Sequence, residues 1–345
     1  MGFEMTRRGA KLALAALLAI SASVGARAQS VEDFYKGKSI DVVIAFSAGG
    51  GYDLYGRLLA RHMGKHIPGN PTLVPQNMPG AGTLKATKYL YSVAPKDGTV
   101  FGVFSRTMPL APVVGLAGAD FDARKFTWLG SMAKEVTLCV VSDRSPVDSW
   151  EDALKTEFKL GGEGKGADPD IFANVIKTVF DAKDQLVTGY PGTADMYLAI
   201  ERGELDGMCG LSYSSLLGRW GKQLQDGSLK IILQGGLQPH PELKDVPNMV
   251  DLAQDARKKQ ILKLILAPQA MARPFAAPPG VPEDRAKALR DAFEATLKDP
   301  EFLAEAKKLN VEIELMSADD IQGLLSDLYD TPKDLAEEAS KDAGL

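Results

Sequence analysis

The chain has few of the side chains that most often carry catalysis or bind metal ions. Its 345 residues include only two cysteines and three histidines. Cys139 and Cys209 lack the CxxC spacing of a zinc site. No G-x-S-x-G nucleophile motif is found, since the nearest stretch, GLSYS, ends in Ser214. These absences argue against an enzyme, and we expect no cofactor and no metal ion.

Long apolar runs are also missing, with one exception at the start of the chain. There the basic stretch TRRGAK precedes the small-apolar run LALAALLAISASVG, and Ala26 and Ala28 form an A-x-A cleavage site. This pattern is typical of a secretory signal peptide, so residues 1–28 are excluded from the fold. The run is shorter than the roughly 20 residues of a spanning helix, which disfavours a membrane anchor. The sequence therefore predicts a periplasmic protein, cleaved near Ala28.

An excess of basic residues is lacking as well. The whole chain has a formal net charge of −5, and because the signal segment contributes +3, the mature chain from Gln29 to Leu345 carries −8. Nucleic-acid-binding proteins present a basic face, so nucleic acid is not an expected partner. No later stretch is long and apolar enough to span a membrane, and we expect the exported product to be soluble.

The cysteines and histidines leave alternatives open. An exported protein meets an oxidising compartment, so Cys139 and Cys209 could form a disulfide, although two buried small side chains are the favoured interpretation. His62 and His66 are four residues apart on an expected helix, which would suit a metal ion. No nearby carboxylate completes a ligand set, so a solvent-exposed helix end is favoured.

Strand-like and helix-like segments alternate along most of the chain. The β-branched run SIDVVIAF predicts a strand, and DLYGRLLARHMGKH predicts an amphipathic helix. TLVPQN, GTLKATKYLYSVA and TVFGVF continue the alternation, which indicates βαβ units and a parallel sheet. The pattern restarts at VTLCVVS and continues to LKIILQ. The sequence thus predicts an α/β protein with two such units.

The last hundred residues are mostly helical in pattern. A run of helices with one or two short strands could not form a third sheet, so we expect it to return and cover the first unit. The predicted division is a discontinuous first domain, residues 29–135 and 236–345, with a second domain, residues 136–235, inserted into it.

Each unit contains a strand, a glycine-rich turn and a helix start. The turns are FSAGGGYD, residues 46–53, and GGEGKGADPD, residues 161–170. A helix N-terminus has unpaired N–H donors and a partial positive charge, and glycines let these donors approach a ligand. One such loop on each domain would form the two sides of an anion-binding cleft.

Neither loop fits a nucleotide-binding motif. AGGGYD lacks the G-x-G-x-x-G spacing, and Lys165 is followed by Gly166 where a P-loop requires Ser or Thr. Packing alone explains many glycine-rich turns, so one loop by itself is weak evidence for a site.

Two long stretches together resemble the periplasmic solute receptors of tripartite tricarboxylate transporters, the TctC-like or Bug-type proteins. They are YKGKSIDVVIAFSAGGGYDLYGRLLARHM and NMPGAGTLKATKYLYSVAPKDGTVFGVF. The family pattern is a strand ending in P-A-G-G-G-x-D, then N-x-P-G-A-G, then a P-D-G-y-T strand. FAAPPGVPEDRAKALRDAF matches a later motif, and VTGYPGTADMYLAIERGELDGM matches another less closely. The resemblance covers essentially the whole mature chain, in order.

The resemblance implies a two-domain, type II-like clamshell with a mixed sheet flanked by helices in each domain. Family members hold small carboxylates between the domains and serve membrane permease subunits, without catalysis. The implied function is therefore capture of a di- or aromatic carboxylate by a monomeric receptor. The first domain's candidate ligand-binding residues are Phe46, Ser47, Ala48, Gly49, Gly50, Gly51, Tyr52 and Asp53. Asp53 is expected to be a helix N-cap that fixes the loop without touching the ligand.

The chain departs from the family in the second loop. The family has S-x-G-x-G-S where this chain has GEGKGA, and the candidate residues there are Gly164, Lys165, Gly166 and Ala167. Tyr52 replaces a small Thr or Ser, and Ser47 replaces Pro. One hypothesis is that Tyr52 and Lys165 reshape the cleft for an aromatic or less usual carboxylate. The alternatives are surface packing for Tyr52 and a solvated loop for Lys165.

Ser105 and Arg106 follow the third expected strand, where a ligand-facing loop should begin. Arg106 would suit a bidentate carboxylate contact, although a plain surface arginine fits equally well. Two other functions remain open at this level: a ligand-sensing receptor for a signalling system, and a secreted enzyme acting on small carboxylates.

Overall fold

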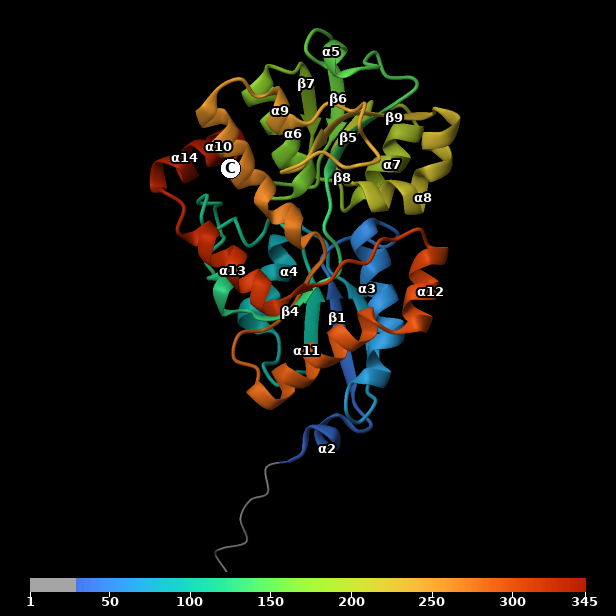
Figure 1. The fold of residues 1–345 in the computed structure, drawn as a ribbon, viewed down its shortest axis with the longest axis vertical. Helices are drawn as coiled ribbons and strands as arrows, with labels where there is room; N and C mark the ends of the chain where they lie inside the picture. Colours follow the sequence, from blue (N-terminus) through green and yellow to red (C-terminus); the bar gives the residue numbers. More distant parts are fainter. Residues whose placement is uncertain (1–28) are drawn as a thin grey trace, which may run out of the picture.

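The computed structural model describes residues 29–345, which form two lobes, each built on its own β-sheet (Figure 1). The predicted signal peptide lies outside the described residues. Within residues 29–345, no helix combines the length and the apolar character needed to cross a membrane.

The first lobe contains a six-stranded sheet in the order β11-β4-β10-β3-β1-β2. Its strands are β1 (Ser39–Ile44), β2 (Thr72–Asn77), β3 (Val100–Val103), β4 (Thr127–Ser131), β10 (Pro274–Ala277) and β11 (Met316–Ser317). The predicted parallel pairing holds for β1 with β2 and β3, whereas β10 runs antiparallel to both β3 and β4. The sheet is therefore mixed.

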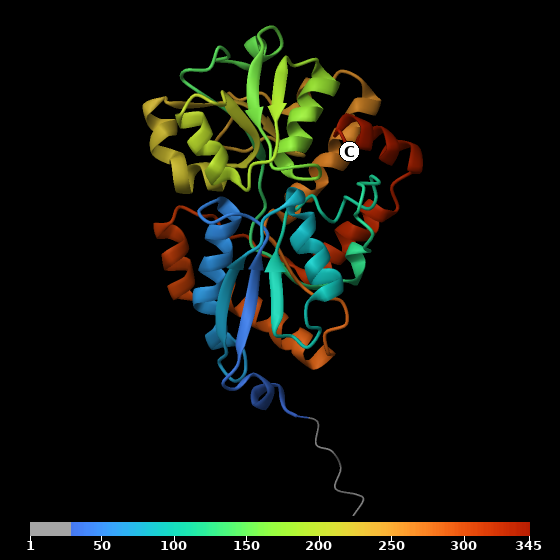
Figure 2. The ribbon, with the colours of Figure 1, turned by 180° about the vertical axis from the view of Figure 1, so that it is seen from behind.

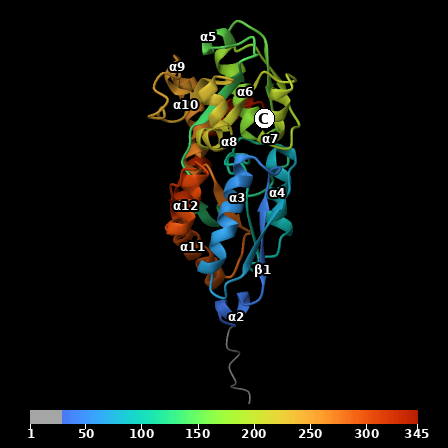
Figure 3. The same ribbon diagram turned by 90° about the vertical axis from the view of Figure 1, so that its right-hand side faces the viewer.

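Helices cover both faces of this first sheet (Figures 2 and 3). They are α2 (Val31–Tyr35), α3 (Gly51–His62), α4 (Leu84–Lys88), α11 (Glu283–Leu297), α12 (Pro300–Lys308) and α13 (Ala318–Tyr329). Helices α11 and α12 are separate, and the side chain of Asp299 caps the start of α12. Ser317 caps α13 through a capping box with Asp320.

The second lobe contains a five-stranded sheet in the order β7-β6-β8-β5-β9. Its strands are β5 (Thr137–Ser142), β6 (Phe158–Gly161), β7 (Asp184–Val187), β8 (Gly207–Ser212) and β9 (Leu229–Gly235). Its helices are α5 (Trp150–Ala153), α6 (Asp168–Phe180), α7 (Thr193–Glu201), α8 (Tyr213–Asp226), α9 (Met249–Leu252), α10 (Ala256–Leu266) and α14 (Lys333–Asp342). Every residue of β5 is buried, since this strand lies between β8 and β9.

The C-terminal part of the chain does not return wholly to the first lobe. Helix α14 packs against α6 and α10, and α9 packs against β9 (Figure 1). Ala336 and Ala339 are buried on the inner face of α14. The expectation that residues 236–345 all cover the first domain therefore does not describe α9, α10 and α14, which lie on the second lobe.

The chain passes between the lobes three times. Residues 132–136 and 267–273 cross side by side, joined by hydrogen bonds from Met132 N–H to the Arg273 carbonyl (3.2 Å) and from Glu135 N–H to the Gln269 carbonyl (3.1 Å). The third crossing, between α13 and α14, lies at the outer edge of the molecule (Figures 1 and 2). The first two crossings therefore connect the lobes as two paired segments.

A disulfide joins Cys139 of β5 to Cys209 of β8. The favoured expectation of two unpaired cysteines is therefore wrong. The two residues are 70 positions apart in the sequence, and only the antiparallel pairing of β5 with β8 makes them neighbours.

Candidate functional site

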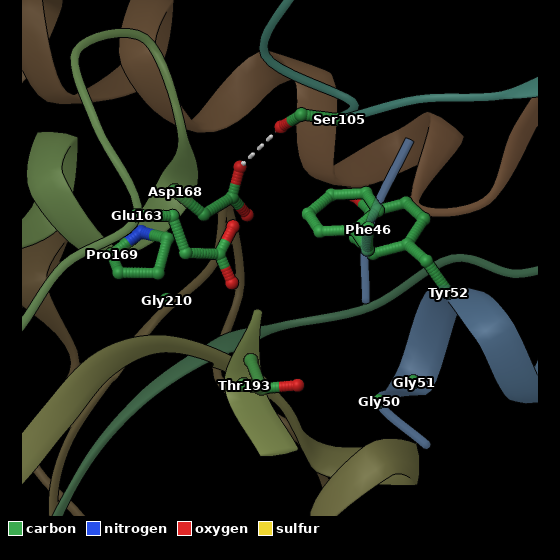
Figure 4. A pocket seen from close by; sticks show the side chains of 10 residues that line it. All are labelled: Phe46, Gly50, Gly51, Tyr52, Ser105, Glu163, Asp168, Pro169, Thr193 and Gly210. Atoms are coloured by element: carbon green, nitrogen blue, oxygen red, sulfur yellow. Dashed lines mark hydrogen bonds between the residues drawn. The ribbon is translucent and has the colours of Figure 1, made fainter. Parts of the chain in front are cut away.

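A small cavity of about 20 Å³ lies between the two lobes. One wall comes from the first lobe and is formed by Phe46, Gly50, Gly51, Tyr52 and Ser105. The other wall comes from the second lobe and is formed by Glu163, Asp168, Pro169, Thr193 and Gly210 (Figure 4). A cavity of this size holds about one water molecule, so the lobes are closed on each other.

The strands explain why these residues meet. Phe46, Ser105 and Glu163 each lie two residues beyond the carboxyl end of a strand, namely β1, β3 and β6. In open α/β sheets ligands bind beyond these ends, where loops converge. The cavity therefore occupies the place where the sequence predicted a ligand site.

The first glycine loop delivers the N-terminus of α3 to this cavity. Gly50 is the residue before the helix and Gly51 is its first residue. The first N–H groups of a helix have no partner within the helix and carry a partial positive charge. With no side chains at Gly50 and Gly51, this end of α3 can receive an anion.

Asp53 holds the loop, but it is not the N-cap as expected. It is the third residue of α3, and its Oδ2 accepts the N–H of Gly49 at 2.8 Å. Its Oδ1 accepts hydrogen bonds from Arg57 Nε (2.9 Å) and Asn77 Nδ2 (2.8 Å). The buried carboxylate is thus fully engaged with the loop and its neighbours, and it does not line the cavity.

The glycines also allow the lobes to approach closely. A Cβ atom at Gly50 would lie 2.7 Å from Thr193 Oγ1, and one at Gly51 would overlap Ser215 Oγ and lie 3.0 Å from its Cβ. Thr193 and Ser215 belong to α7 and α8 of the second lobe. The bare backbone at Gly50 and Gly51 therefore lets the two lobes pack closely.

Tyr52 forms an aromatic wall of the cavity with Phe46. The two rings stack with centroids 4.1 Å apart and an interplanar angle of 11°. Tyr52 Oη accepts the backbone N–H of Arg106 at 3.1 Å, and the guanidinium of Arg273 lies 4.7 Å from the ring centroid. Burial raises the pKa of Tyr52, so its hydroxyl stays protonated.

Arg106 is engaged with the opposite lobe. Its guanidinium forms a buried ion pair with Asp168 at the start of α6, and its Nη1 donates to Ser212 Oγ at 2.9 Å. Ser105 Oγ donates to Asp168 Oδ1 at 3.2 Å. Arg106 Nε and Nη2 both contact Asp168 Oδ2, so the arginine pairs with a protein carboxylate without the expected bidentate geometry, and it does not line the cavity.

The second glycine loop is tied down by its own lobe and its neighbours. Asp170 Oδ2 accepts the N–H groups of Glu163 (2.6 Å) and Gly164 (2.8 Å), and the Gly166 carbonyl accepts Thr107 Oγ1 (2.5 Å). Lys165 is exposed. None of the four candidates Gly164, Lys165, Gly166 and Ala167 lines the cavity.

Three further candidates, Ser47, Ala48 and Gly49, do not line the cavity. Ser47 Oγ donates to Asp195 Oδ2 of α7 at 2.6 Å, and Ser47 N–H donates to the Pro191 carbonyl. Ala48 is exposed. Ser47 therefore contributes to the contact between the lobes.

Sequence reasoning missed Glu163, although it lies inside the second loop. Its side chain points from the second lobe into the space facing Phe46 and Tyr52 (Figure 4). It is only 8% exposed, and its Oε1 has no hydrogen-bonding partner among residues 29–345. Burial, together with the nearby Asp168, Asp170 and Asp195, raises the pKa of Glu163 well above its usual range. An acidic residue between glycines was the only signal for it.

The side chains of His62 and His66 contact carboxylates instead of ending in solvent. His62 Nε2 lies 2.6 Å from Glu305 Oε2, and His66 Nε2 lies 2.8 Å from Asp299 Oδ2. Both carboxylates come from the region of α12, far along the sequence, so the expectation of a solvent-exposed helix end is wrong. In the part of the chain that the structure describes, no three His, Cys, Asp or Glu side chains cluster to hold a metal ion.

Comparison with known proteins agrees with this architecture. No family model matches the chain. The solved structure of the periplasmic binding protein BugD aligns with a TM-score of 0.71 and 21% identity, over 90% of this chain and 99% of that chain. This chain has the fold of the periplasmic binding proteins. The predicted two-domain fold, with a mixed sheet in each lobe, is confirmed.

Two further structures with this fold were solved with a carboxylate bound. MatC from Rhodopseudomonas palustris, with bound malate, has a TM-score of 0.69 at 18% identity and covers 88% of this chain and 99% of that chain. An R. palustris protein with adipate has a TM-score of 0.69 at 18% identity and covers 89% and 98%. A Cupriavidus necator protein described as "UPF0065 protein in gbd 5'region" is 23% identical over 310 residues, covering 87% of this chain and 88% of that protein.

Proposed function

We propose that this chain is an extracytoplasmic solute receptor of the TctC-like, Bug type. It captures a small carboxylate between its lobes and delivers it to a membrane transporter of the tripartite tricarboxylate class. The observation that carries the proposal is the N-terminus of α3, which meets the interlobe cavity at Gly50 and Gly51. A helix N-terminus stripped of side chains binds a carboxylate without a cationic side chain.

The malate and adipate complexes of similarly folded proteins support this ligand class. The sequence motifs that build the α3 loop are also those on which the resemblance to the receptor family rests. We further propose that the receptor is exported after cleavage near Ala28, works as a monomer and catalyses no reaction.

Binding requires the lobes to move. The cavity of about 20 Å³ is far smaller than a dicarboxylate, so the ligand enters an open form and the lobes then close around it. The paired segments 132–136 and 267–273 are the hinge for this movement. Closure brings the α3 N-terminus and the second-lobe wall onto opposite sides of the ligand.

The test begins with the identity of a bound acid. The mature chain is purified from the periplasm, and native mass spectrometry determines the mass of any co-purified ligand. The protein is then unfolded and refolded to remove this ligand, and its melting temperature is measured with a panel of mono- and dicarboxylates and with their neutral amides as controls.

A ligand that binds only the native state stabilises it by about 2.7 kcal/mol at one hundred times its Kd. We therefore expect at least one carboxylate to raise the melting temperature by several degrees, and its amide to have no effect. If no carboxylate in the panel raises it, the proposed function is wrong.

A further inference from the structure

Glu163 places a carboxyl group in a site that is otherwise suited to an anion. It projects from the second-lobe wall of the cavity, opposite the wall formed by Gly50, Gly51 and Tyr52 (Figure 4). The side chain is nine-tenths buried, and Oε1 has no partner among the described residues. A buried polar group without a partner costs free energy, so its retention needs an explanation.

No cationic side chain lines the cavity to compensate Glu163. Arg106 is engaged with Asp168 and Ser212, and Lys165 is exposed. Arg273 pairs with Glu135 at 3.5 Å and donates to Ser215 Oγ at 2.8 Å. No residue that lines the cavity therefore supplies a positive charge to pair with the Glu163 carboxylate.

Three aspartate carboxylates lie near Glu163. Asp168 and Asp170 lie in the first turn of α6, and Asp195 lies in the first turn of α7. All three act on Glu163 and disfavour its ionised form. A ligand that carried only carboxylates would bring another negative charge to this wall, whereas a cationic group would relieve the repulsion.

We propose that the ligand of this cleft is an aminocarboxylate, whose carboxylate binds at the N-terminus of α3 and whose ammonium group is bound by Glu163. This inference rests on the proposed function, because it assigns the second half of the ligand of the same site. The α3 N-terminus belongs to the first lobe and Glu163 to the second. A ligand therefore links the two lobes only if it carries both a carboxylate and an ammonium group.

Proton release is a second consequence. In the ligand-free cleft, burial and the neighbouring Asp168, Asp170 and Asp195 keep the pKa of Glu163 high and favour its protonated form. An arriving ammonium group stabilises the carboxylate, so the proton leaves Glu163 for the solvent. A plain dicarboxylate would release no proton, because Glu163 stays protonated and can then donate a hydrogen bond to it.

The experiment compares matched pairs of acids by isothermal titration calorimetry on refolded, ligand-free protein. The pairs are L-glutamate with glutarate, L-aspartate with succinate, 4-aminobutyrate with butyrate, and L-phenylglycine with phenylacetate. At pH 7 we expect at least one amino member to bind at least tenfold more tightly than its partner. Titrations in buffers of different ionisation enthalpy should show proton release on binding.

Glu163→Gln keeps the size of the side chain and removes its charge. It should weaken binding of the amino member at least tenfold, narrow the gap within the pair and abolish proton release. The matched control is Glu204→Gln, because Glu204 is an exposed glutamate of the same lobe that does not line the cavity. The control should behave as the wild type.

The outcomes separate this inference from the proposed function. If plain carboxylates bind as tightly as their amino partners, or the amino members bind without proton release, the aminocarboxylate assignment is overturned and the receptor function stands. If Glu163→Gln binds the amino member like the wild type, the assignment is also overturned. If no acid of either kind binds, both proposals fail.

Discussion

Gly51→Ala is expected to hold the lobes apart. The new methyl group would overlap Ser215 Oγ and lie 3.0 Å from Ser215 Cβ, on the opposite lobe. Ser215 Oγ cannot move without cost, because it accepts a hydrogen bond from Arg273 Nη2 at 2.8 Å. The Nε of the same guanidinium already lacks a partner among residues 29–345. In the closed form of the variant, either the new methyl group overlaps Ser215 Oγ or the hydrogen bond between Arg273 and Ser215 Oγ is lost.

The size of the effect follows from these two costs. Overpacking costs about 1–3 kcal/mol, and a hydrogen bond to a charged group contributes about 1.5–3 kcal/mol. The structure relaxes along the cheaper route, so we expect closure to lose about 1–3 kcal/mol. Since about 1.4 kcal/mol corresponds to a factor of ten, ligand affinity should fall by roughly 5- to 140-fold. The open form should be unaffected, because Ser215 then lies away from α3.

Calorimetry with the identified ligand measures the affinity, and solution X-ray scattering measures the radius of gyration of the protein with the ligand present. The control is Gly323→Ala in α13, where an added Cβ meets no atom within 4 Å. In a Ser215→Ala background, Gly51→Ala should cost less, because the overlapping oxygen is gone. Wild-type affinity and radius of gyration for Gly51→Ala would refute the idea that close packing of α3 on the second lobe controls closure.

Three further changes test other parts of the structure. Asp168→Asn leaves the buried guanidinium of Arg106 without its counter-charge, at a cost of about 3 kcal/mol to the closed form, so scattering should show a larger radius of gyration; an unchanged radius would contradict this. Replacing both Cys139 and Cys209 by alanine opens a loop spanning 70 residues and should lower the free energy of unfolding by about 4 kcal/mol. Equal denaturant midpoints for the variant and the wild type would contradict this. Burial raises the pKa of Asp184 to about 6, so its protonated form is favoured in the fold and its contribution to stability is lost as the pH rises from about 4 to 6. Asp184→Asn should therefore be more stable than the wild type at pH 8 by on the order of 2 kcal/mol and lose this advantage at pH 4, whereas a constant difference in unfolding free energy would contradict the assignment.

Local sequence patterns predict the elements that are long and periodic. The strands β1 and β3 and the helix α6 follow directly from β-branched runs and from a helix with Pro169 in its first turn. Strands β4 and β10 were not predicted, because TWLGS and PFAA are short and have few β-branched residues. Their place in the first sheet is set by long-range pairing, which no local pattern contains.

The residues of the candidate site also divide into those that the sequence predicted and those that it did not. Phe46, Gly50, Gly51, Tyr52 and Ser105 were predicted and line the cavity, because they follow strands whose ends could be recognised in the sequence. The second-lobe wall was largely missed, since its members meet the first lobe only when the molecule closes. Lys165 shows the limit most clearly. A glycine-rich loop can turn a side chain either way, and here it turns the lysine to solvent while the neighbouring Glu163 faces the cavity.

The third passage of the chain between the lobes, from α13 to α14, has a mechanical consequence. Two adjacent connecting segments alone would let the lobes bend toward each other and also twist relative to each other. A further tether at the outer edge of the molecule opposes the twist and leaves one easy direction of motion (Figure 1). A restrained twist would keep Ser47 aligned with Asp195, and Arg106 with Asp168, whenever the lobes close. The connection to the C-terminal helix would thereby limit how the two lobes move relative to each other.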